Sequence, residues 1–457
     1  MYLACMKPRH KGEGSLRLRT FRKGIHPTDS KAFTNTKEIE HLPLPDEVFV
    51  PFQQHIGAPG EPTVSPGDEV RTGQCIGRSE RFVSSPVHAS VTGEVKAIAT
   101  FPHPIGVNAQ MVHIRRTQED EWDLLPIPKD WRAESRENLC KLVWDAGIVG
   151  LGGAAFPTHV KLSPPKEKPI DAFILNGCEC EPYLTADHRA MVELTPKILT
   201  GMSIIMKVLG VRKGYIAIET NKPDAIEAMQ VCSKHNDLDA AIVPLQTRYP
   251  QGAEKMLIQS VLGRRVPPGG LPMDVGVIVN NVGTALAVTE AVIEGKPLIQ
   301  RIVTITGNGI NEPKNVMTRV GSSFSHLIRH CGGLKTETSQ VFMGGPMMGI
   351  AQYDLNVPVV KATSAIICTT DTTVKRIKTS PCIRCGNCVS ACPMNLLPTR
   401  LARLTEMKQW ESAEELGINH CIECGSCSYV CPSHIPLVQW IRLGKYHLTQ
   451  MKAKALV

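Results

Sequence analysis

The strongest signal in the chain lies near its C-terminus, in the stretch Cys382-Ile-Arg-Cys385-Gly-Asn-Cys388-Val-Ser-Ala-Cys392-Pro393. The same spacing, C-x2-C-x2-C-x3-C-P, returns in Cys421-Ile-Glu-Cys424-Gly-Ser-Cys427-Ser-Tyr-Val-Cys431-Pro432. Three thiolates at this spacing can face one iron–sulfur cube, while the fourth, before proline, turns away to serve the other cube. The runs therefore predict two [4Fe–4S] clusters. The first would be bound by Cys382, Cys385, Cys388 and Cys431, and the second by Cys421, Cys424, Cys427 and Cys392.

Zinc sites and disulfides are the alternative interpretations of these runs. Zinc usually takes two separated pairs of ligands rather than four cysteines within one short run. Half of the sixteen cysteines lie in the two runs, and the others are scattered without a pairing pattern. That usage fits a reducing cytosol, where free thiols and clusters persist.

The whole chain has the composition of a multidomain globular protein. Its 457 residues are enough for three or more domains with separate cores. No apolar stretch approaches the roughly 20 residues that span a bilayer. The N-terminus also lacks the uninterrupted apolar region of an export signal. We therefore expect neither a transmembrane segment nor a signal peptide, and any membrane association should be peripheral.

The net charge of +8 is modest, with a local excess of Lys and Arg in residues 1–40. Nucleic-acid binding is one interpretation, but no nucleic-acid-binding motif accompanies the charge, and we expect no nucleic-acid partner. An acidic protein partner or an anionic membrane surface explains the charge equally well.

Residues 1–40 read as an irregular N-terminal arm, with ordered structure expected from about Leu42. Residues 41–115 consist of short β-runs cut by Gly and Pro. Their two halves resemble a lipoyl/biotinyl barrel-sandwich hybrid. Residues 72–95 contain no lysine, so we expect an unmodified structural or docking module. Residues 116–135 read as a linker.

Residues 136–297 predict a Rossmann-like α/β domain. Apolar β-runs at 171–176, 214–220 and 275–280 alternate with helical segments, which is typical of a parallel sheet covered by helices. Ligands of such sheets bind outside the carboxyl ends of the strands. Polar residues follow three strands at that edge, and the glycine-rich loop at 150–161 precedes them with backbone amides that suit a phosphate.

The C-terminal third predicts two further modules. Residues 298–350 read as a small β-grasp domain and residues 351–371 as a linker. Residues 372–447 carry the cysteine runs and also helical segments near 398–408, 411–416 and 437–447. The predicted fold class is therefore multidomain α/β and α+β, ending in a helical two-cluster ferredoxin domain.

Three stretches of the α/β domain resemble the flavin-binding 51 kDa subunit of respiratory complex I. Gly150-Leu-Gly-Gly-Ala-Ala-Phe-Pro-Thr-His-Val-Lys161 looks like its Gly-Gly-Ala-Gly-Phe-Pro…Lys loop. Asn176-Gly-Cys-Glu-Cys-Glu-Pro-Tyr-Leu-Thr-Ala-Asp187 is similar to its Asn-Ala-Asp-Glu-Gly-Glu-Pro…Asp motif, and Asn280-Asn-Val-Gly-Thr284 to its Asn-Asn-Val-Glu-Thr turn. The order of modules resembles the C-subunit family of the membrane-bound Rnf (Rsx) ferredoxin:NAD oxidoreductases.

This resemblance implies non-covalent FMN, NAD(H) as substrate, and other subunits of a membrane-embedded complex as partners, at the cytoplasmic face of the cell membrane. A ferredoxin-type electron partner would be served indirectly. The FMN residues that it implies are Gly150, Gly152, Gly153, Lys161, Asn176, Glu179, Asn280, Asn281 and Thr284. Glu181 would lie beside the nicotinamide. The segment Tyr249-Pro-Gln-Gly-Ala-Glu254 falls where the family has a motif that contacts both flavin and NADH, so Glu254 joins Glu181 as a catalytic candidate.

The chain departs from the family pattern at four positions of these motifs: Cys178, Cys180, Ala253 and Gly283. The two cysteines also allow a redox-sensitive pair.

The predicted chemistry is electron transfer between NADH, FMN and two clusters, because a flavin exchanges electrons with a nicotinamide in pairs and with a cluster singly. The predicted enzyme is thus an NADH-linked oxidoreductase subunit of an ion-translocating complex. One alternative is a stand-alone flavin/iron–sulfur reductase, such as a cobalamin reductase. Another is a non-catalytic electron carrier without an active flavin.

Overall fold

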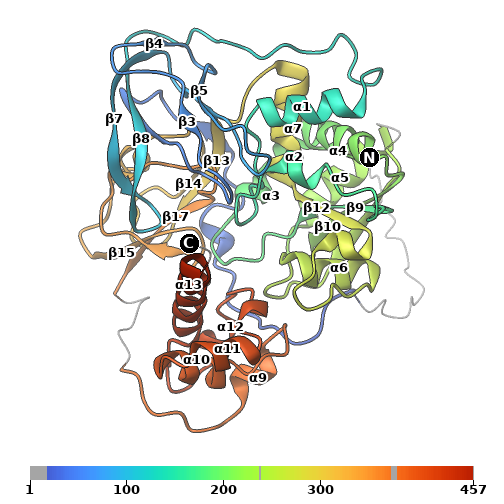
Figure 1. Ribbon diagram of the computed structural model, residues 1–457, viewed down its shortest axis with the longest axis vertical. Helices are drawn as coiled ribbons and strands as arrows, with labels where there is room; N and C mark the ends of the chain where they lie inside the picture. Colours follow the sequence, from blue (N-terminus) through green and yellow to red (C-terminus); the bar gives the residue numbers. More distant parts are fainter. Residues whose placement is uncertain (1–17, 236–237, 372–377, 456–457) are drawn as a thin grey trace, which may run out of the picture.

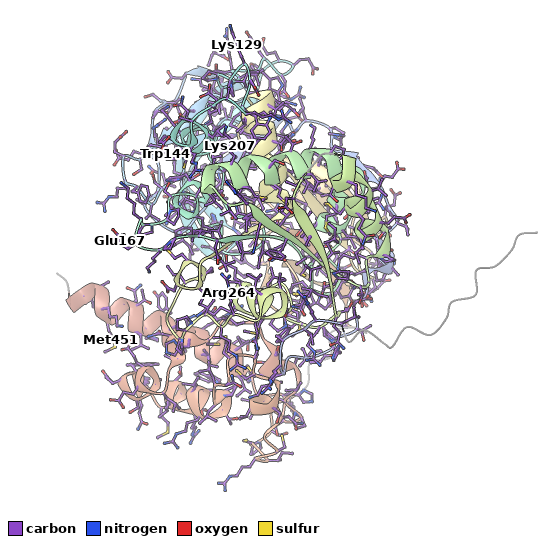
Figure 2. All side chains as sticks on the ribbon, turned by 90° about the vertical axis from the view of Figure 1, so that its right-hand side faces the viewer. Lys129, Trp144, Glu167, Lys207, Arg264 and Met451 are labelled. Carbon is purple, nitrogen blue, oxygen red and sulfur yellow. The ribbon has the colours of Figure 1, made fainter. Side chains whose placement is uncertain are left out.

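The computed structural model describes residues 18–235, 238–371 and 378–455. Figure 1 shows a β-rich N-terminal domain beside an α/β domain, with a second β-sheet domain next to them and a helical C-terminal domain below. Figure 2, turned by 90°, shows the same stacking: the helix that carries Met451 lies beneath the α/β domain, where Arg264 and Lys207 are found. The predicted multidomain α/β and α+β class is confirmed.

The N-terminal domain is a sandwich of two antiparallel sheets, as its β-runs predicted. One sheet has the strand order β2-β8-β7-β4 and the other the order β3-β5-β6. Valine and isoleucine side chains from both sheets, such as Val48, Ile76 and Ile114, are fully buried between them. The strands are β2 (Glu47–Pro51), β3 (Glu61–Pro62), β4 (Glu69–Val70), β5 (Cys75–Arg78), β6 (Val87–His88), β7 (Gly93–His103) and β8 (Val107–Arg116).

The α/β domain is built on a parallel sheet of order β11-β10-β9-β12. Strand β11 was not predicted; it contains Pro244, which an edge strand tolerates because one side of that strand makes no ladder bonds. The strands are β9 (Ala172–Gly177), β10 (Lys213–Glu219), β11 (Ala240–Leu245) and β12 (Val277–Asn281).

Helices cover both faces of this sheet, as predicted. Helix α6 packs on one face, while α1, α3, α4, α5 and α7 bury a larger core on the other. Two short helices, α2 and α3, were not predicted. The helices are α1 (Arg136–Asp145), α2 (Thr158–Lys161), α3 (Ala186–Glu193), α4 (Thr195–Leu209), α5 (Pro223–His235), α6 (Glu254–Leu262) and α7 (Val282–Glu294).

The second sheet domain extends beyond the predicted β-grasp boundaries at both ends. Its strand order is β1-β14-β13-β17-β15-β16. The predicted linker at 351–371 is therefore wrong for residues 365–370, because the fully buried β17 lies in the middle of the sheet, next to β13. The elements are β1 (Ile39–His41), β13 (Gln300–Thr306), β14 (Lys314–Arg319), α8 (Phe324–His330), β15 (Thr338–Met343), β16 (Ile350–Ala351) and β17 (Ala365–Thr370).

The N-terminal arm is ordered well before Leu42, which corrects the predicted start of ordered structure. Residues 1–17 of the predicted arm lie outside the described residues. From residue 18 the arm pairs with the α/β domain through bridges at Arg19 and Ile25, forms the 3-10 turn η1 (Lys31–Phe33), and ends as β1 beside β14. The pairing partners are more than 200 positions away in sequence, which hides this order from local patterns.

The C-terminal domain is helical, as predicted. Residues 372–377 of its predicted range lie outside the described residues. Its elements are α9 (Asn387–Ala391), α10 (Pro398–Glu406), α11 (Trp410–Glu415), η3 (Ile418–His420), α12 (Ser426–Tyr429) and α13 (Leu437–Ala455). Helix α13 runs past the predicted end at 447. Within the described ranges, no helix is both long and apolar enough to cross a membrane.

One buried lysine joins three of these domains. The Nζ of Lys361, which precedes β17, donates to the carbonyl oxygen of Pro86 in the sandwich (2.9 Å) and of Gly147 in the α/β domain (2.7 Å). Burial lowers the pKa of this ammonium to about 7. Its two carbonyl partners fix the relative positions of the sheet domains.

Gly201 decides how α4 and α7 cross. A Cβ at this position would overlap the carbonyl oxygen of Ala285 on α7.

Although alanine favours a helix over glycine by about 1 kcal/mol, we expect Gly201→Ala to lower the free energy of unfolding by about 1–3 kcal/mol, because the helices must separate. Urea unfolding of this variant, with Thr200→Ala on the same helix as the control, tests the crossing; a Gly201→Ala protein as stable as the parent would contradict it.

Candidate functional site

The glycine-rich loop connects α1 to α2 and is closed on itself. Val149 and Pro157 form a β-bridge across its base, and the Gly150 amide donates to the Phe156 carbonyl oxygen (2.9 Å). The Leu151 amide donates to Thr284 Oγ1 (3.0 Å), which ties the loop to α7. The loop is therefore held beside the carboxyl end of β12.

Two glycines at the tip of this loop are exposed but have different surroundings. A Cβ on Gly152 would lie 2.9 Å from Nδ2 of Asn281, whereas a Cβ on Gly153 would meet nothing within 4 Å. Gly152 is thus required for the close approach of loop and strand end. At Gly153 the open space leaves the backbone accessible to a ligand.

Asn280 and Asn281 end strand β12 opposite the loop. The Asn281 side chain accepts from the Gly283 amide (2.8 Å), which caps α7, and donates to Asp187 Oδ2 (2.6 Å). Among the described residues, Asn280 Nδ2 is buried without a hydrogen-bond partner. A buried donor without a partner costs free energy, so this amide suits a ligand rich in acceptors, as FMN is.

Lys161 and Glu254 are brought together from α2 and the start of α6. The Lys161 ammonium pairs with the Glu254 carboxylate and also donates to the Val279 carbonyl oxygen (3.2 Å). Both side chains remain partly exposed. Two residues that the resemblance assigned to flavin and nicotinamide therefore form one ion pair beside β12.

Asn176 and Glu179 are bonded to the protein backbone after β9. Asn176 Nδ2 donates to the Gly252 carbonyl oxygen (2.9 Å), and its Oδ1 accepts from the Cys178 amide (3.0 Å). The Glu179 carboxylate accepts from the amides of Asp187 (2.9 Å) and His188, at the start of α3. These two side chains shape the site's walls.

Cys178 and Cys180 have separate surroundings. The Cys178 thiol donates to the Ala217 carbonyl oxygen, and the Cys180 sulfur accepts from the Gly252 amide. Burial, followed by the nearby Glu219, raises the pKa of both thiols. Protonated thiols are poor nucleophiles, so the structure disfavours a redox-sensitive pair here.

Glu181 lies where three domains meet. Its carboxylate accepts from the Met347 amide (3.1 Å) of the second sheet domain and from the Tyr249 hydroxyl (3.4 Å). Burial raises the pKa of this carboxyl to about 7, and the Met347 hydrogen bond opposes the rise. A carboxyl with this pKa can hold or release a proton near neutral pH.

The eight cysteines of the two runs lie in two neighbourhoods of the C-terminal domain. Cys382, Cys385, Cys388 and Cys431 together line one cavity of about 230 Å³. Cys421, Cys424, Cys427 and Cys392 lie close enough to affect one another: burial first, then its neighbouring thiols, raises the pKa of Cys427 to about 12. Each set thus takes three cysteines from one run and one from the other.

The two sets differ in their surroundings. Cys424 packs with Tyr249, Ile25 and Ala391 against the α/β domain. Cys382 and Cys385 are exposed, and the Ile383 side chain between them is 67% exposed. The second set therefore packs against the α/β domain through Cys424, whereas Cys382 and Cys385 of the first set face outward.

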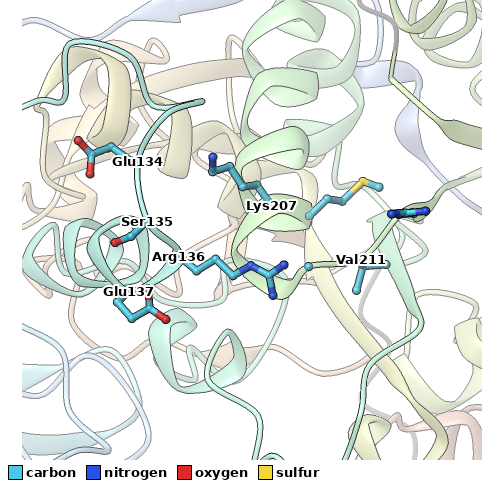
Figure 3. Close-up of a pocket in the computed structure, with 9 residues that line it drawn as sticks. Glu134, Ser135, Arg136, Glu137, Lys207 and Val211 are labelled. Carbon is cyan, nitrogen blue, oxygen red and sulfur yellow. The ribbon is translucent and has the colours of Figure 1, made fainter.

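A surface hollow of about 560 Å³ lies elsewhere, between the start of α1 and the end of α4 (Figure 3). Arg136 and Lys207 line it. Because α4 leads into the amino end of β10, this hollow lies at the sheet edge opposite the strand carboxyl ends. It holds none of the predicted site residues.

Comparisons with known proteins agree with this arrangement. Four family models match the chain: the RnfC barrel sandwich hybrid domain over residues 19–119, the Nuo51 FMN-binding domain over 143–290, the SLBB domain over 302–351 and the 4Fe-4S dicluster domain over 381–435.

Full-length relatives are also similar. The C subunit of the proton-translocating ferredoxin:NAD(+) oxidoreductase complex of Clostridium ljungdahlii is 49% identical over 87% of this chain and 87% of its own. The C subunit of the Na(+)-translocating complex of Acetobacterium woodii is 45% identical over 95% of this chain and 98% of its own. The C subunit of the ion-translocating oxidoreductase complex of Rhodobacter capsulatus is 42% identical over 95% of this chain and 84% of its own.

The chain belongs to the RnfC family. The predicted family, order of domain types and cofactor classes, FMN and two [4Fe–4S] clusters, are thereby confirmed.

Three residues at this RnfC-type site could not be predicted from the sequence in the roles that they have. Lys31 from the arm donates to the carbonyl oxygens of Glu181 (2.9 Å) and Leu184 (2.5 Å). Asp187, to which the motifs assigned no role, has its pKa raised by burial and by the neighbouring Glu179. Met347 supplies the amide that binds Glu181. Of the three, only Asp187 belongs to a motif recognisable in the sequence, at its end, but the motif gave no role for it.

Glu181 should make stability depend on pH. Its folded pKa of about 7 exceeds its ordinary 4.5. The folded state thus binds more protons in this interval, and stability falls as the pH rises through it, by up to about 3 kcal/mol. We expect Glu181→Gln to lose this dependence, so that the parent loses stability relative to the variant between about pH 5 and about pH 8. Thermal unfolding across this range, with the exposed Glu411→Gln as control, measures the difference; parallel curves would exclude it.

Proposed function

We propose that this chain is the NADH-handling subunit of a membrane-bound, ion-translocating ferredoxin:NAD oxidoreductase, and that it exchanges electrons between NADH and its partner subunits. The observation that supports this proposal most strongly is that one crossed set of four cysteines packs, through Cys424, against the domain with the FMN-type loop. The similar chains from three bacteria, each the C subunit of an ion-translocating oxidoreductase, support the same function.

The residues around the loop fit FMN. The backbone amides of Gly150, Gly152 and Gly153 would hold its phosphate, with Lys161 supplying a positive charge. Asn280, whose Nδ2 has no hydrogen-bond partner among the described residues, would bond a polar group of FMN directly. Asn281 and Thr284 would act on FMN by holding the loop and the start of α7, since their side chains are bonded to Asp187, Gly283 and Leu151. Asn176 and Glu179 would act on FMN by holding the backbone that surrounds it, since their side chains are already bonded.

When bound, FMN supplies a group that exchanges electrons in pairs with a nicotinamide and singly with a cluster. The protein's own residues hold the binding groups in place and move protons. Glu254 holds the Lys161 ammonium next to the strand end. Glu181, with its pKa near neutrality, would take up or release the proton that accompanies oxidation of NADH.

The two cysteine sets would bind an inner and an outer cluster, and electrons would pass through them in that order. The set of Cys421, Cys424, Cys427 and Cys392 would bind the cluster nearer to the flavin site. The set of Cys382, Cys385, Cys388 and Cys431 would bind the outer cluster, which the exposed thiols leave accessible to a partner protein of the complex. Because all eight thiols must lose protons on binding, cluster assembly should release protons.

We propose a peripheral position at the cytoplasmic face of the membrane, with the remaining subunits of the complex as partners and ferredoxin served indirectly. The order of domains and the relatives' length coverage favour this over a stand-alone reductase or a non-catalytic carrier. As functional units we propose the arm (1–40), the unmodified sandwich (41–115), the FMN/NADH domain (136–297), the β-grasp domain (from 298, extended to β17) and the two-cluster domain (372–447).

Flavin content tests the site. In Gly152→Leu the side chain would enter the space of Asn281 and cover the loop amides. We expect the purified variant to release no flavin on denaturation, while its iron content stays that of the parent, because the cysteine sets are in another domain. Glu119→Leu, at an exposed position beside the sandwich, is the control. Equal loss of flavin and iron would show a folding defect, and unchanged flavin would show that the loop does not hold FMN.

A further inference from the structure

The N-terminal arm and Tyr249 meet in a short antiparallel contact. Ile25 and Tyr249 exchange both backbone hydrogen bonds, each at 2.9 Å. Tyr249 belongs to the segment between β11 and α6, and its side chain is only 1% exposed. We call Lys23, Gly24, Ile25 and Tyr249 the arm clamp.

The arm clamp binds both loops that carry the second cysteine set. The Tyr249 hydroxyl donates to the Cys424 carbonyl oxygen (2.7 Å), within the second cysteine run. The Gly24 amide donates to the Ala391 carbonyl oxygen (3.1 Å), one residue before Cys392 in the first run. Lys23 Nζ adds a hydrogen bond to the Val389 carbonyl oxygen (3.1 Å).

Sterically, the arm clamp leaves little freedom. Gly24 has a left-handed φ of 76°, and a Cβ there would lie 2.5 Å from the Tyr249 carbonyl oxygen and 2.8 Å from the Phe21 ring. Ile25, Tyr249, Ala391 and Cys424 form one buried apolar cluster. A change in the arm must therefore move Tyr249 or the cysteine loops.

We propose that the arm clamp is a positioning element for electron transfer: it fixes the cluster of the second cysteine set against the flavin site and raises that cluster's reduction potential. A hydrogen-bond donor held beside a ligating cysteine places positive charge near the cluster and so favours its reduced, more negative state. This inference rests on the proposed function. Oxidation of one NADH to NAD+ releases one proton and two electrons, and each cluster accepts one of these electrons.

Tyr249→Phe removes the hydroxyl that bonds to Cys424 and, at a longer distance, to Glu181, while the ring remains to fill its buried site. We expect parental iron and flavin content, and the rate of cluster reduction is compared with the rate of flavin bleaching by NADH in the same sample. Cluster reduction after rapid mixing should be roughly tenfold slower or more. An EPR-monitored redox titration should show one cluster shifted to lower potential and the other unchanged. Tyr429→Phe, a 54% exposed tyrosine of the same cysteine run, is the matched control.

Gly24→Ala tests the arm's contribution. Its matched control is Gly106→Ala, which carries a similar left-handed φ of 83° but has open space around it. We expect slower cluster reduction in Gly24→Ala and the parental rate in Gly106→Ala. Parental rates and potentials in both Tyr249→Phe and Gly24→Ala would overturn the proposal, as would loss of iron from both, since the arm clamp would then serve folding only. If the control variants also leave their clusters oxidised with NADH, the proposed function itself has failed.

Discussion

Two buried lysines hold the carboxyl edge of the parallel sheet, and the rest of the site depends on them. Lys222 is fully buried and donates to Glu219 Oε2 (3.0 Å) and to the Glu179 carbonyl oxygen (3.4 Å), while Lys31 holds the carbonyl oxygen of Glu181. Removing one partner of such a buried pair costs about 3–5 kcal/mol, because a charge is left without compensation. The segment that follows β9 is therefore fixed from both sides.

That fixed segment positions the elements of electron transfer. The Glu179 carboxylate accepts hydrogen bonds from the first turn of α3, and Asp187 of that turn is bonded to Asn281 beside the glycine-rich loop. Two residues after Glu179, Glu181 reaches Met347 and Tyr249. One short piece of backbone thus connects the FMN-type loop, the second sheet domain and the cluster domain.

Local sequence patterns predicted most of the fold but not its long-range pairings. Helices such as α4 and α7 follow from periodicity, and the parallel sheet follows from alternating segments. Strand β17 reads as a linker in the sequence because its two pairing partners, β13 and β15, lie far from it along the chain. Likewise β1 has three residues, and nothing within them indicates that they pair with β14.

The same limit applies to the site. The crossed cysteine sets and the strand-end asparagines could be predicted, because spacing and strand direction decide which side chains meet. The hydrogen bond from Tyr249 to Cys424 joins residues 175 positions apart, and that from Met347 to Glu181 joins residues 166 positions apart. Contacts of this kind come from domain packing, which no motif encodes.

The central claim is that electrons from NADH reach the clusters within this one chain. Anaerobic addition of NADH to the purified protein, followed by visible absorbance and EPR, tests it most directly. The account predicts that the flavin absorbance is bleached and that the EPR signal of at least one reduced [4Fe–4S] cluster appears in the same sample. Clusters that stay oxidised with NADH and are reduced only by a strong chemical reductant would contradict it.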